Sequence, residues 1–137
     1  MKKRNLFIFL NIIIPLFIGL ATYLFCYKNT YINTLFAHLF NFDFPYLYRD
    51  TVLHSFITNW ACDILWAYSL TFSLFFCFMV FNKSLLITTA ISILSATIIE
   101  LLQLGNIVNG TFDILDIILE VSAIILAVMI IRKECSK

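Results

Sequence analysis

Residues 85–104 read LLITTAISILSATIIELLQL, an apolar run whose one charged residue is Glu100. A stretch of about 20 mostly apolar residues matches a helix that crosses the hydrocarbon core of a bilayer, which is about 30 Å thick. Three further runs of the same kind occupy residues 6–27, 62–81 and 114–131. All four are too long and too uniformly apolar to be strands of a soluble protein. The sequence therefore predicts an all-α integral membrane protein with a bundle of four transmembrane helices.

The composition agrees with this prediction and excludes other classes. Of the 137 residues, 62% are hydrophobic and 12% are charged, against about 45–50% and about 25% in ordinary soluble domains. Disordered chains need low hydrophobicity and a high net charge, so that class is excluded. Nine basic residues against eight acidic ones leave no basic excess, so nucleic acid is not an expected partner. The expected partner is the lipid bilayer, and we expect residues 1–137 to form a single membrane domain.

The charged residues predict the orientation. With four spans, seven of the nine basic residues fall on one side of the membrane and seven of the eight acidic residues fall toward the other. Basic residues are retained on the cytoplasmic side, so we expect both termini in the cytoplasm. The basic residues on that side are Lys2, Lys3, Arg4, Lys83, Arg132, Lys133 and Lys137.

The long connection between the first two spans, residues 28–61, is not polar. Its apolar residues repeat with helical spacing, and polar residues lie opposite them. This pattern predicts an amphipathic helix in the outer interface, ended by Pro45, and then a shorter helix capped by Asp50. The apolar face of the first helix consists of Ile32, Leu35, Phe36, Leu39 and Phe40, and its polar face of Asn33, Thr34, His38 and Asn41.

Acidic residues lie inside three of the four predicted spans. An ionisable residue at the centre of a membrane helix costs about 2.5–3.5 kcal/mol on insertion scales, so its presence is a functional hypothesis by default. Helical spacing places these residues on one face of each helix. We expect the three faces to meet and form a polar pocket from Asp63, Trp66, Glu100, Gln103, Asp113, Asp116 and Glu120.

Several acids in one pocket cannot all remain charged without a counter-charge. The candidates are protons, a bound cation, or Arg49 and His54 from the outer connection. Hydrogen bonding to neighbouring amide and hydroxyl groups is a simpler alternative. Asp113 and Asp116 also suit the positive end of the fourth helix, which Asp113 is placed to cap. This structural explanation weakens for Glu120, which lies nearly two turns into that helix.

Three segments of the chain resemble the VanZ-like family of small bacterial membrane proteins. Glu100-Leu-Leu-Gln103, a short loop, and Thr111-Phe-Asp113-Ile-Leu-Asp116 are similar to the end of one family helix and the start of the last. Asp63-Ile-Leu-Trp66-Ala-Tyr68-Ser-Leu70 is similar to a motif that opens an earlier span in a subgroup. The resemblance covers residues 59–128, about half of the chain.

The resemblance implies a multi-pass protein of the bacterial inner (cytoplasmic) membrane with an envelope role. The name-giving member is associated with resistance to the glycopeptide teicoplanin, and most members have no defined biochemical activity. Two departures put shared ligand chemistry in doubt. The loop of residues 104–110 lacks the Arg that many members carry, and Glu120 with Ser122-Ala123 stands where many members have Asn and then Gly.

No motif for metal or cofactor chemistry is present. Cys26 and Cys62 fall near the outer face and suit a disulfide in an oxidising compartment, but free thiols are the preferred interpretation. The sequence has no Cys-x-x-Cys pair, and neither histidine has metal-ligand spacing. Carboxylates alone would suit Mg²⁺ or Ca²⁺, but a hydrolase would need further groups to hold a phosphate. We therefore expect no resident metal, no cofactor and no catalytic residue, and favour a function other than catalysis.

Three functional hypotheses follow. In the first, an outward acidic pocket engages a cell-wall or lipid-linked ligand, a glycopeptide or another cationic antimicrobial. In the second, a homo-oligomer conducts protons or cations, although no polar stripe reaches the cytoplasmic side. In the third, a membrane metalloenzyme acts on lipid head groups, although basic phosphate-binding residues are missing from the spans. The sequence favours the first.

Overall fold

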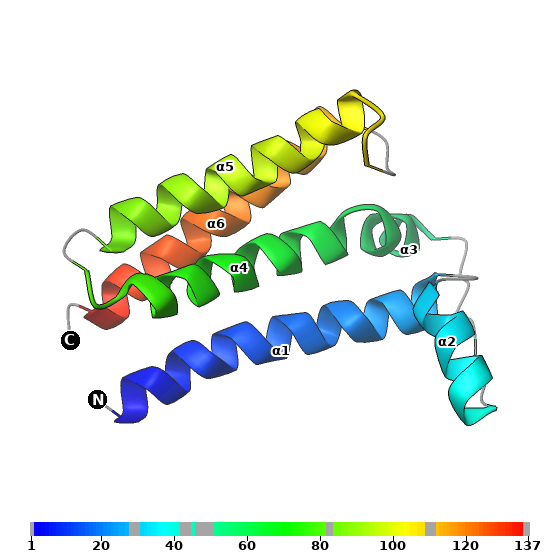
Figure 1. The fold of residues 1–137 in the computed structure, drawn as a ribbon, viewed down its shortest axis with the longest axis horizontal. Coiled ribbons are helices and arrows are strands. Elements are labelled where there is room, and N and C mark those ends of the chain that lie inside the picture. The colour runs from blue at the N-terminus through cyan, green and yellow to red at the C-terminus, as the bar shows by residue number, and fades with distance from the viewer. Residues whose placement is uncertain are drawn as a thin grey trace.

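The computed structural model describes residues 2–27, 31–41, 45, 51–81, 84–108 and 112–135 (Figure 1). Every regular element in these ranges is a helix. Four of the helices are long and apolar enough to cross a membrane, which confirms the predicted fold class and makes the chain a polytopic membrane protein. They cover Lys3–Cys26, His54–Phe78, Ser84–Leu104 and Ile114–Cys135.

The elements follow one another as α1 (Lys2–Cys26), α2 (Tyr31–Phe40), α3 (Val52–Phe56), the π-helical segment η1 (Ile57–Ala61), α4 (Cys62–Phe78), α5 (Ser84–Leu104) and α6 (Ile114–Cys135). Helix α4 is central, because it packs against α1 on one side and against α5 and α6 on the other (Figure 1). Helix α1 begins and α6 ends at the same end of the bundle, opposite α2 and α3 (Figure 1). An even number of spans requires this arrangement.

Small side chains let the central helices approach closely. Ala67, Ala96 and Ala123 are buried together where α4, α5 and α6 meet. Small residues at such crossings bring helix backbones together, which is how membrane helices gain packing energy without a hydrophobic driving force. Helix α1 is peripheral by comparison: among its described side chains only Ile8 is buried. Its other described side chains are partly buried against α4 or exposed to lipid.

The second apolar helix starts earlier than the sequence suggested. The expected start was residue 62, but α3, η1 and α4 run on from one another, so the apolar helix begins at His54. Thr51 caps α3, because its Oγ1 accepts a hydrogen bond from the His54 N–H at 3.2 Å. The proposed cap, Asp50, lies outside the described residues, as do Arg49 and Lys83.

Helix α2 is the predicted amphipathic segment, and it lies across the end of the bundle (Figure 1). Its apolar side chains Leu35, Leu39 and Phe40 are exposed, as expected of a helix that lies in a membrane interface. Its polar face holds it to the protein instead. The Asn33 side-chain amide donates to the carbonyl of Leu24 at 3.3 Å and to that of Tyr27 at 3.2 Å, where α1 ends.

The end of α2 corrects one prediction. Pro45 was expected to stop this helix, but α2 ends at Phe40. Asn41 adopts a left-handed conformation with φ of 50°, and its N–H bonds to the Ala37 carbonyl at 3.0 Å. This is an αL cap, in which Asn replaces the more usual Gly. The local hydrogen-bonding ability of Asn therefore ends the helix before Pro45 is reached.

Candidate functional site: an acidic pocket at one end of the bundle

The turn from α5 to α6 positions the acidic residues. Helix α5 ends in a Schellman motif, with Asn106 at φ of 54°. The Ile107 N–H bonds to the Leu102 carbonyl at 2.9 Å, and the Asn106 N–H to the Gln103 carbonyl at 2.9 Å. The motif satisfies carbonyls that the helix end leaves free and starts the chain reversal. The start of α6 then lies beside the end of α5.

Asp113 caps α6, as the sequence predicted. Its Oδ1 accepts a hydrogen bond from the Leu115 N–H at 2.9 Å, and its carbonyl accepts one from the Asp116 N–H at 3.1 Å. The Asp113 N–H in turn donates to Oε2 of Glu100 at 3.4 Å. Glu100 therefore ties the end of α5 to the start of α6, which gives it a structural role beside any functional one.

A cavity of about 480 Å³ lies between η1, α4, α5 and α6, and we name it the acidic pocket. It brings together six of the seven predicted site residues, and five of the six are acids. Among the described residues that line it, none is Lys, Arg or His. The lining consists of Tyr27, Thr58, Asn59, Trp60, Asp63, Ile99, Glu100, Gln103, Asp113, Asp116 and Glu120.

The acids differ in burial and in hydrogen bonding. Glu100 and Glu120 are each 4% exposed, whereas Asp63 is exposed. Glu120 Oε2 and Asp116 Oδ1 are buried and have no hydrogen-bond partner among the described residues. The carboxylates of Asp63, Glu100 and Asp116 are close enough to repel that of Glu120. Because buried polar atoms are nearly always hydrogen-bonded, this arrangement suits a ligand that brings donors and positive charge.

Residues from η1 complete the pocket wall, and sequence reasoning missed them. The Tyr27 hydroxyl donates a hydrogen bond to the Thr58 carbonyl across the end of α1. Burial, and then the neighbouring Cys62 and Asp63, raise the pKa of Tyr27, so its hydroxyl keeps its proton and remains a donor. π-Helical segments occur often at functional sites. The sequence did contain one indication of this wall: Asn59 lies four residues before Asp63 and is therefore on the same helix face.

Trp66 lies elsewhere. It is not among the residues that line the acidic pocket; it lines a second cavity, of about 360 Å³, formed by α1 and α4. We name this cavity the α1–α4 groove. Its lining is mostly apolar, and its one acid, Asp63, borders both cavities. Asp63 is thus the link between the two.

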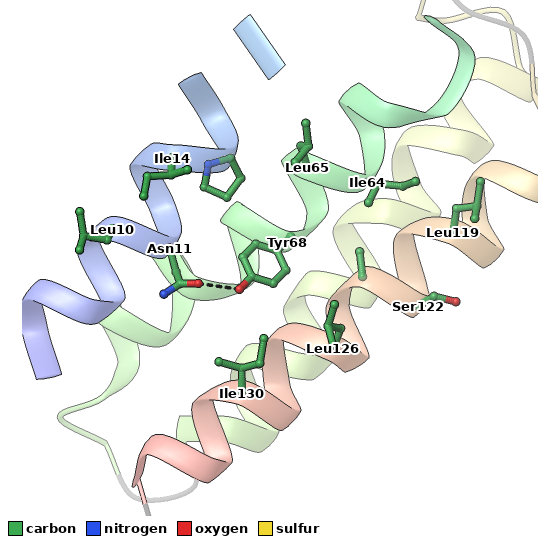
Figure 2. Close-up of a pocket in the computed structure, with 12 residues that line it drawn as sticks. Leu10, Asn11, Ile14, Ile64, Leu65, Tyr68, Leu119, Ser122, Leu126 and Ile130 are labelled. Atoms are coloured by element: carbon green, nitrogen blue, oxygen red, sulfur yellow. Dashed lines mark hydrogen bonds between the residues drawn. The ribbon is translucent and has the colours of Figure 1, made fainter. Parts of the chain in front are cut away.

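A third cavity, of about 620 Å³, is bounded by α1, α4 and α6 (Figure 2). Its few polar groups bond within the protein. The Tyr68 hydroxyl donates to Oδ1 of Asn11 at 2.6 Å, and the Asn11 amide donates to the Phe7 carbonyl at 2.9 Å. The Ser122 hydroxyl donates to the Ile118 carbonyl at 2.7 Å. The walls of this cavity therefore suit a hydrocarbon ligand. They offer few interactions to a charged ligand.

The cysteines are free thiols in this structure: Cys26, Cys62, Cys77 and Cys135. Within the described ranges, no group of three or more His, Cys, Asp or Glu side chains is arranged to hold a metal ion.

No family model, curated protein or solved structure matches the chain. The four-helix membrane architecture is shown by the structure itself.

Proposed function

We propose that the chain is a VanZ-like protein of the bacterial envelope that acts by binding rather than by catalysis. In this proposal the acidic pocket faces outward and receives a cationic group of a cell-wall ligand, a lipid-linked ligand or a glycopeptide of the teicoplanin type. One observation carries the proposal: Glu120 is 4% exposed, its Oε2 has no hydrogen-bond partner among the described residues, and the described residues that line its pocket include five acids and no base.

The chemistry of an ammonium group fits this site. Two unit charges 4 Å apart interact by about 4 kcal/mol at the effective dielectric of a protein surface. An ammonium also has three N–H donors and no acceptor. It would supply donors to Glu120 Oε2 and Asp116 Oδ1, which are buried and have none among the described residues. An anionic ligand would instead add to the repulsion among the acids.

The outward orientation is part of the proposal. The shared end of α1 and α6 (Figure 1) and the basic residues near both termini support placing the termini in the cytoplasm. The acidic pocket, at the other end, then faces outward. Reporter fusions after Lys83 and after Lys133 should both give cytoplasmic signals. An external signal at either position contradicts this orientation.

Glycopeptide susceptibility tests the function. A deletion strain is complemented with the wild-type gene, with Asp116→Asn, or with Glu134→Gln, which makes the same chemical change at the other end of α6. We expect the deletion and Asp116→Asn strains to change susceptibility in the same direction, and Glu134→Gln to match wild type at equal expression. Susceptibility that is unchanged by deletion contradicts the glycopeptide link.

A second candidate is a proton- or cation-conducting homo-oligomer. The hydroxyl oxygens of Ser69, Thr88 and Ser92 are buried and have no hydrogen-bond partner among the described residues. Other hydroxyls in these helices bond to the carbonyl four residues earlier, as those of Thr71 and Thr97 do. Thr88 and Ser92 continue the Glu100 face of α5 toward the opposite end, so polar groups extend further than the sequence suggested. Proton flux into proteoliposomes that is lost in Ser92→Ala would favour this candidate; the binding proposal predicts no flux in wild type.

A further inference from the structure

We propose that the ligand is a lipid with an amine-bearing, cationic head group, which places the amine in the acidic pocket and a hydrocarbon chain in the α1–α4 groove. The inference rests on the proposed function, because it requires the acidic pocket to bind a cation. It adds the chemical class of the ligand and a second binding surface.

The groove has the character of a chain-binding site. Helix α1 contributes Pro15 and Gly19 to it, and α4 contributes Leu65 and Trp66. Both helices are candidate membrane spans, so the groove opens toward bilayer hydrocarbon. Gly19 carries no side chain, and a Cβ placed there would lie 4.0 Å from the Leu65 side chain, an ordinary contact distance. A Cβ therefore fits at position 19 without a clash, and a larger side chain there would extend into the groove that Gly19 and Leu65 line.

Asp63 connects the groove to the charged site. It lines both the groove and the acidic pocket, and it is the exposed member of the acidic set. A molecule whose chain lies along Leu65 and Trp66 therefore has its polar end beside Asp63. The acidic pocket that Asp63 shares also contains Glu120, whose buried Oε2 has no hydrogen-bond partner among the described residues. The groove and the acidic pocket thus meet at Asp63, which matches the connection of chain and amine in such a lipid.

The same order argues against other occupants. A soluble cation would use the acidic pocket and leave the groove unused. A lipid with an anionic head group would place negative charge beside Asp63 and be repelled. A helix from a second copy would fill the groove but would bring no cation to Glu120. The amine-bearing lipid is the occupant that satisfies both surfaces.

The two tryptophans allow a direct test. Trp60 lines the acidic pocket and Trp66 lines the groove, and the chain has no others. The Trp60→Phe variant therefore reports on the groove alone. It is placed in phosphatidylcholine nanodiscs that contain a small fraction of lipid with brominated chains, either lysyl-phosphatidylglycerol or phosphatidylglycerol. We expect greater loss of Trp66 emission with the lysyl lipid.

Matched variants locate the effect. Asp63→Asn should reduce the quenching to that of brominated phosphatidylglycerol, because the head group loses its nearest acid. Gly19→Leu should reduce quenching by filling the groove, whereas Ile18→Leu, at a position that is 49% exposed and outside the groove, should not. Circular dichroism and size-exclusion profiles are compared first, so that a misfolded variant is recognised.

Equal quenching by the two brominated lipids overturns the inference. A second measurement separates this failure from failure of the proposed function: the Trp66→Phe variant, whose remaining Trp60 lies in the acidic pocket, is titrated with soluble lysinamide. If Trp60 emission responds but the lipid preference is absent, the pocket binds cations and the lipid assignment is wrong. If neither signal appears, both proposals fail. If Gly19→Leu instead converts a dimer to a monomer, the groove holds a second copy and the lipid assignment is also overturned.

Discussion

The two ends of the bundle are built from the same helices but are packed differently. At the end where α1 begins, Phe72 of α4, Ile131 of α6 and Ile8 of α1 form a core cluster with exposures of 0%, 2% and 2%. At the other end, Glu100 and Glu120 occupy the equivalent inward positions of α5 and α6 and border the acidic pocket. Large apolar side chains close one end; mutually repelling carboxylates leave the other open.

This difference indicates that the sequence specifies the open end and that it is not simply a region of incomplete packing. Apolar side chains at its inward positions would pack as they do at the closed end, and replacing buried charges by well-packed apolar residues is often neutral or stabilising. The chain instead places there a buried Glu120 whose Oε2 has no hydrogen-bond partner among the described residues. We interpret the closed end as the main source of stability and Asp116 and Glu120 of the open end as the source of function, and the predictions below rank the sites by their expected effect on stability.

The largest effect is expected at the closed end. Phe72 is 0% exposed and its ring packs against those of Phe7 and Tyr68, with centroids 6.4 and 5.0 Å away. Phe72→Ala should cost about 3–5 kcal/mol of unfolding free energy, because it removes buried area and leaves a cavity. Phe76→Ala, at a position on the same helix that is 43% exposed, should cost far less. Denaturant unfolding in mixed micelles measures both, and similar losses would remove the distinction.

Glu100 is the acid whose replacement should destabilise the protein. Glu100→Ala removes the acceptor for the Asp113 N–H and should cost about 1.5–3 kcal/mol, the usual range for hydrogen bonds to charged groups. Glu100→Gln keeps a side-chain carbonyl and should recover part of this loss. The same unfolding assay applies. An Ala variant as stable as wild type would show that this contact does not hold α5 to α6.

The α6 cap should have a smaller effect. Asp113→Ala loses the hydrogen bond from the Leu115 N–H and should cost about 1 kcal/mol, the typical value for a helix N-cap. Asp113→Asn keeps a capping oxygen and should remain close to wild type. If Asn is as destabilising as Ala, then charge rather than capping is the contribution of Asp113.

The smallest effect is expected in the apolar cavity between the ends. Tyr68→Phe removes the hydrogen bond to Asn11 (Figure 2) and should cost about 0.6 kcal/mol, the average for such bonds between membrane helices. Leaving Asn11 Oδ1 without its donor raises the cost, so Tyr68→Phe with Asn11→Leu should be nearer to wild type than Tyr68→Phe alone. A double-mutant cycle in the unfolding assay measures this, and strict additivity would contradict the coupling.

The sequence predicted the presence of the helices better than the residues at which they begin and end. Hydropathy found four spans because about 20 apolar residues have few alternatives to a membrane helix. It placed the end of α2 at Pro45 because proline is a strong helix breaker, but the local hydrogen-bonding of Asn41 acts first. It also missed the continuation from α3 through η1 into α4, because Thr58 and Asn59 interrupt the apolar pattern without breaking the helix.

The candidate site was predictable where it depends on helix faces. Asp116 and Glu120 lie one turn apart, so their shared face follows from spacing alone. The structural role of Glu100 was not predictable, because its bond to the Asp113 N–H crosses from one helix to the next. The position of Trp66 depends on how α1 packs on α4, which no spacing within α4 encodes. Contacts between helices were therefore the information that the sequence lacked.

The central claim is that Asp116 and Glu120 at the open end serve binding and not folding, and the Asp116→Asn/Glu120→Gln double variant tests it most directly. Lysinamide binding, followed by Trp60 emission, and unfolding free energy are measured on the same preparations of wild type and variant. The account predicts that binding is lost while the unfolding free energy is unchanged or higher, since two repelling carboxylates are removed. Retained binding, or a loss of stability comparable to that of Phe72→Ala, would contradict it.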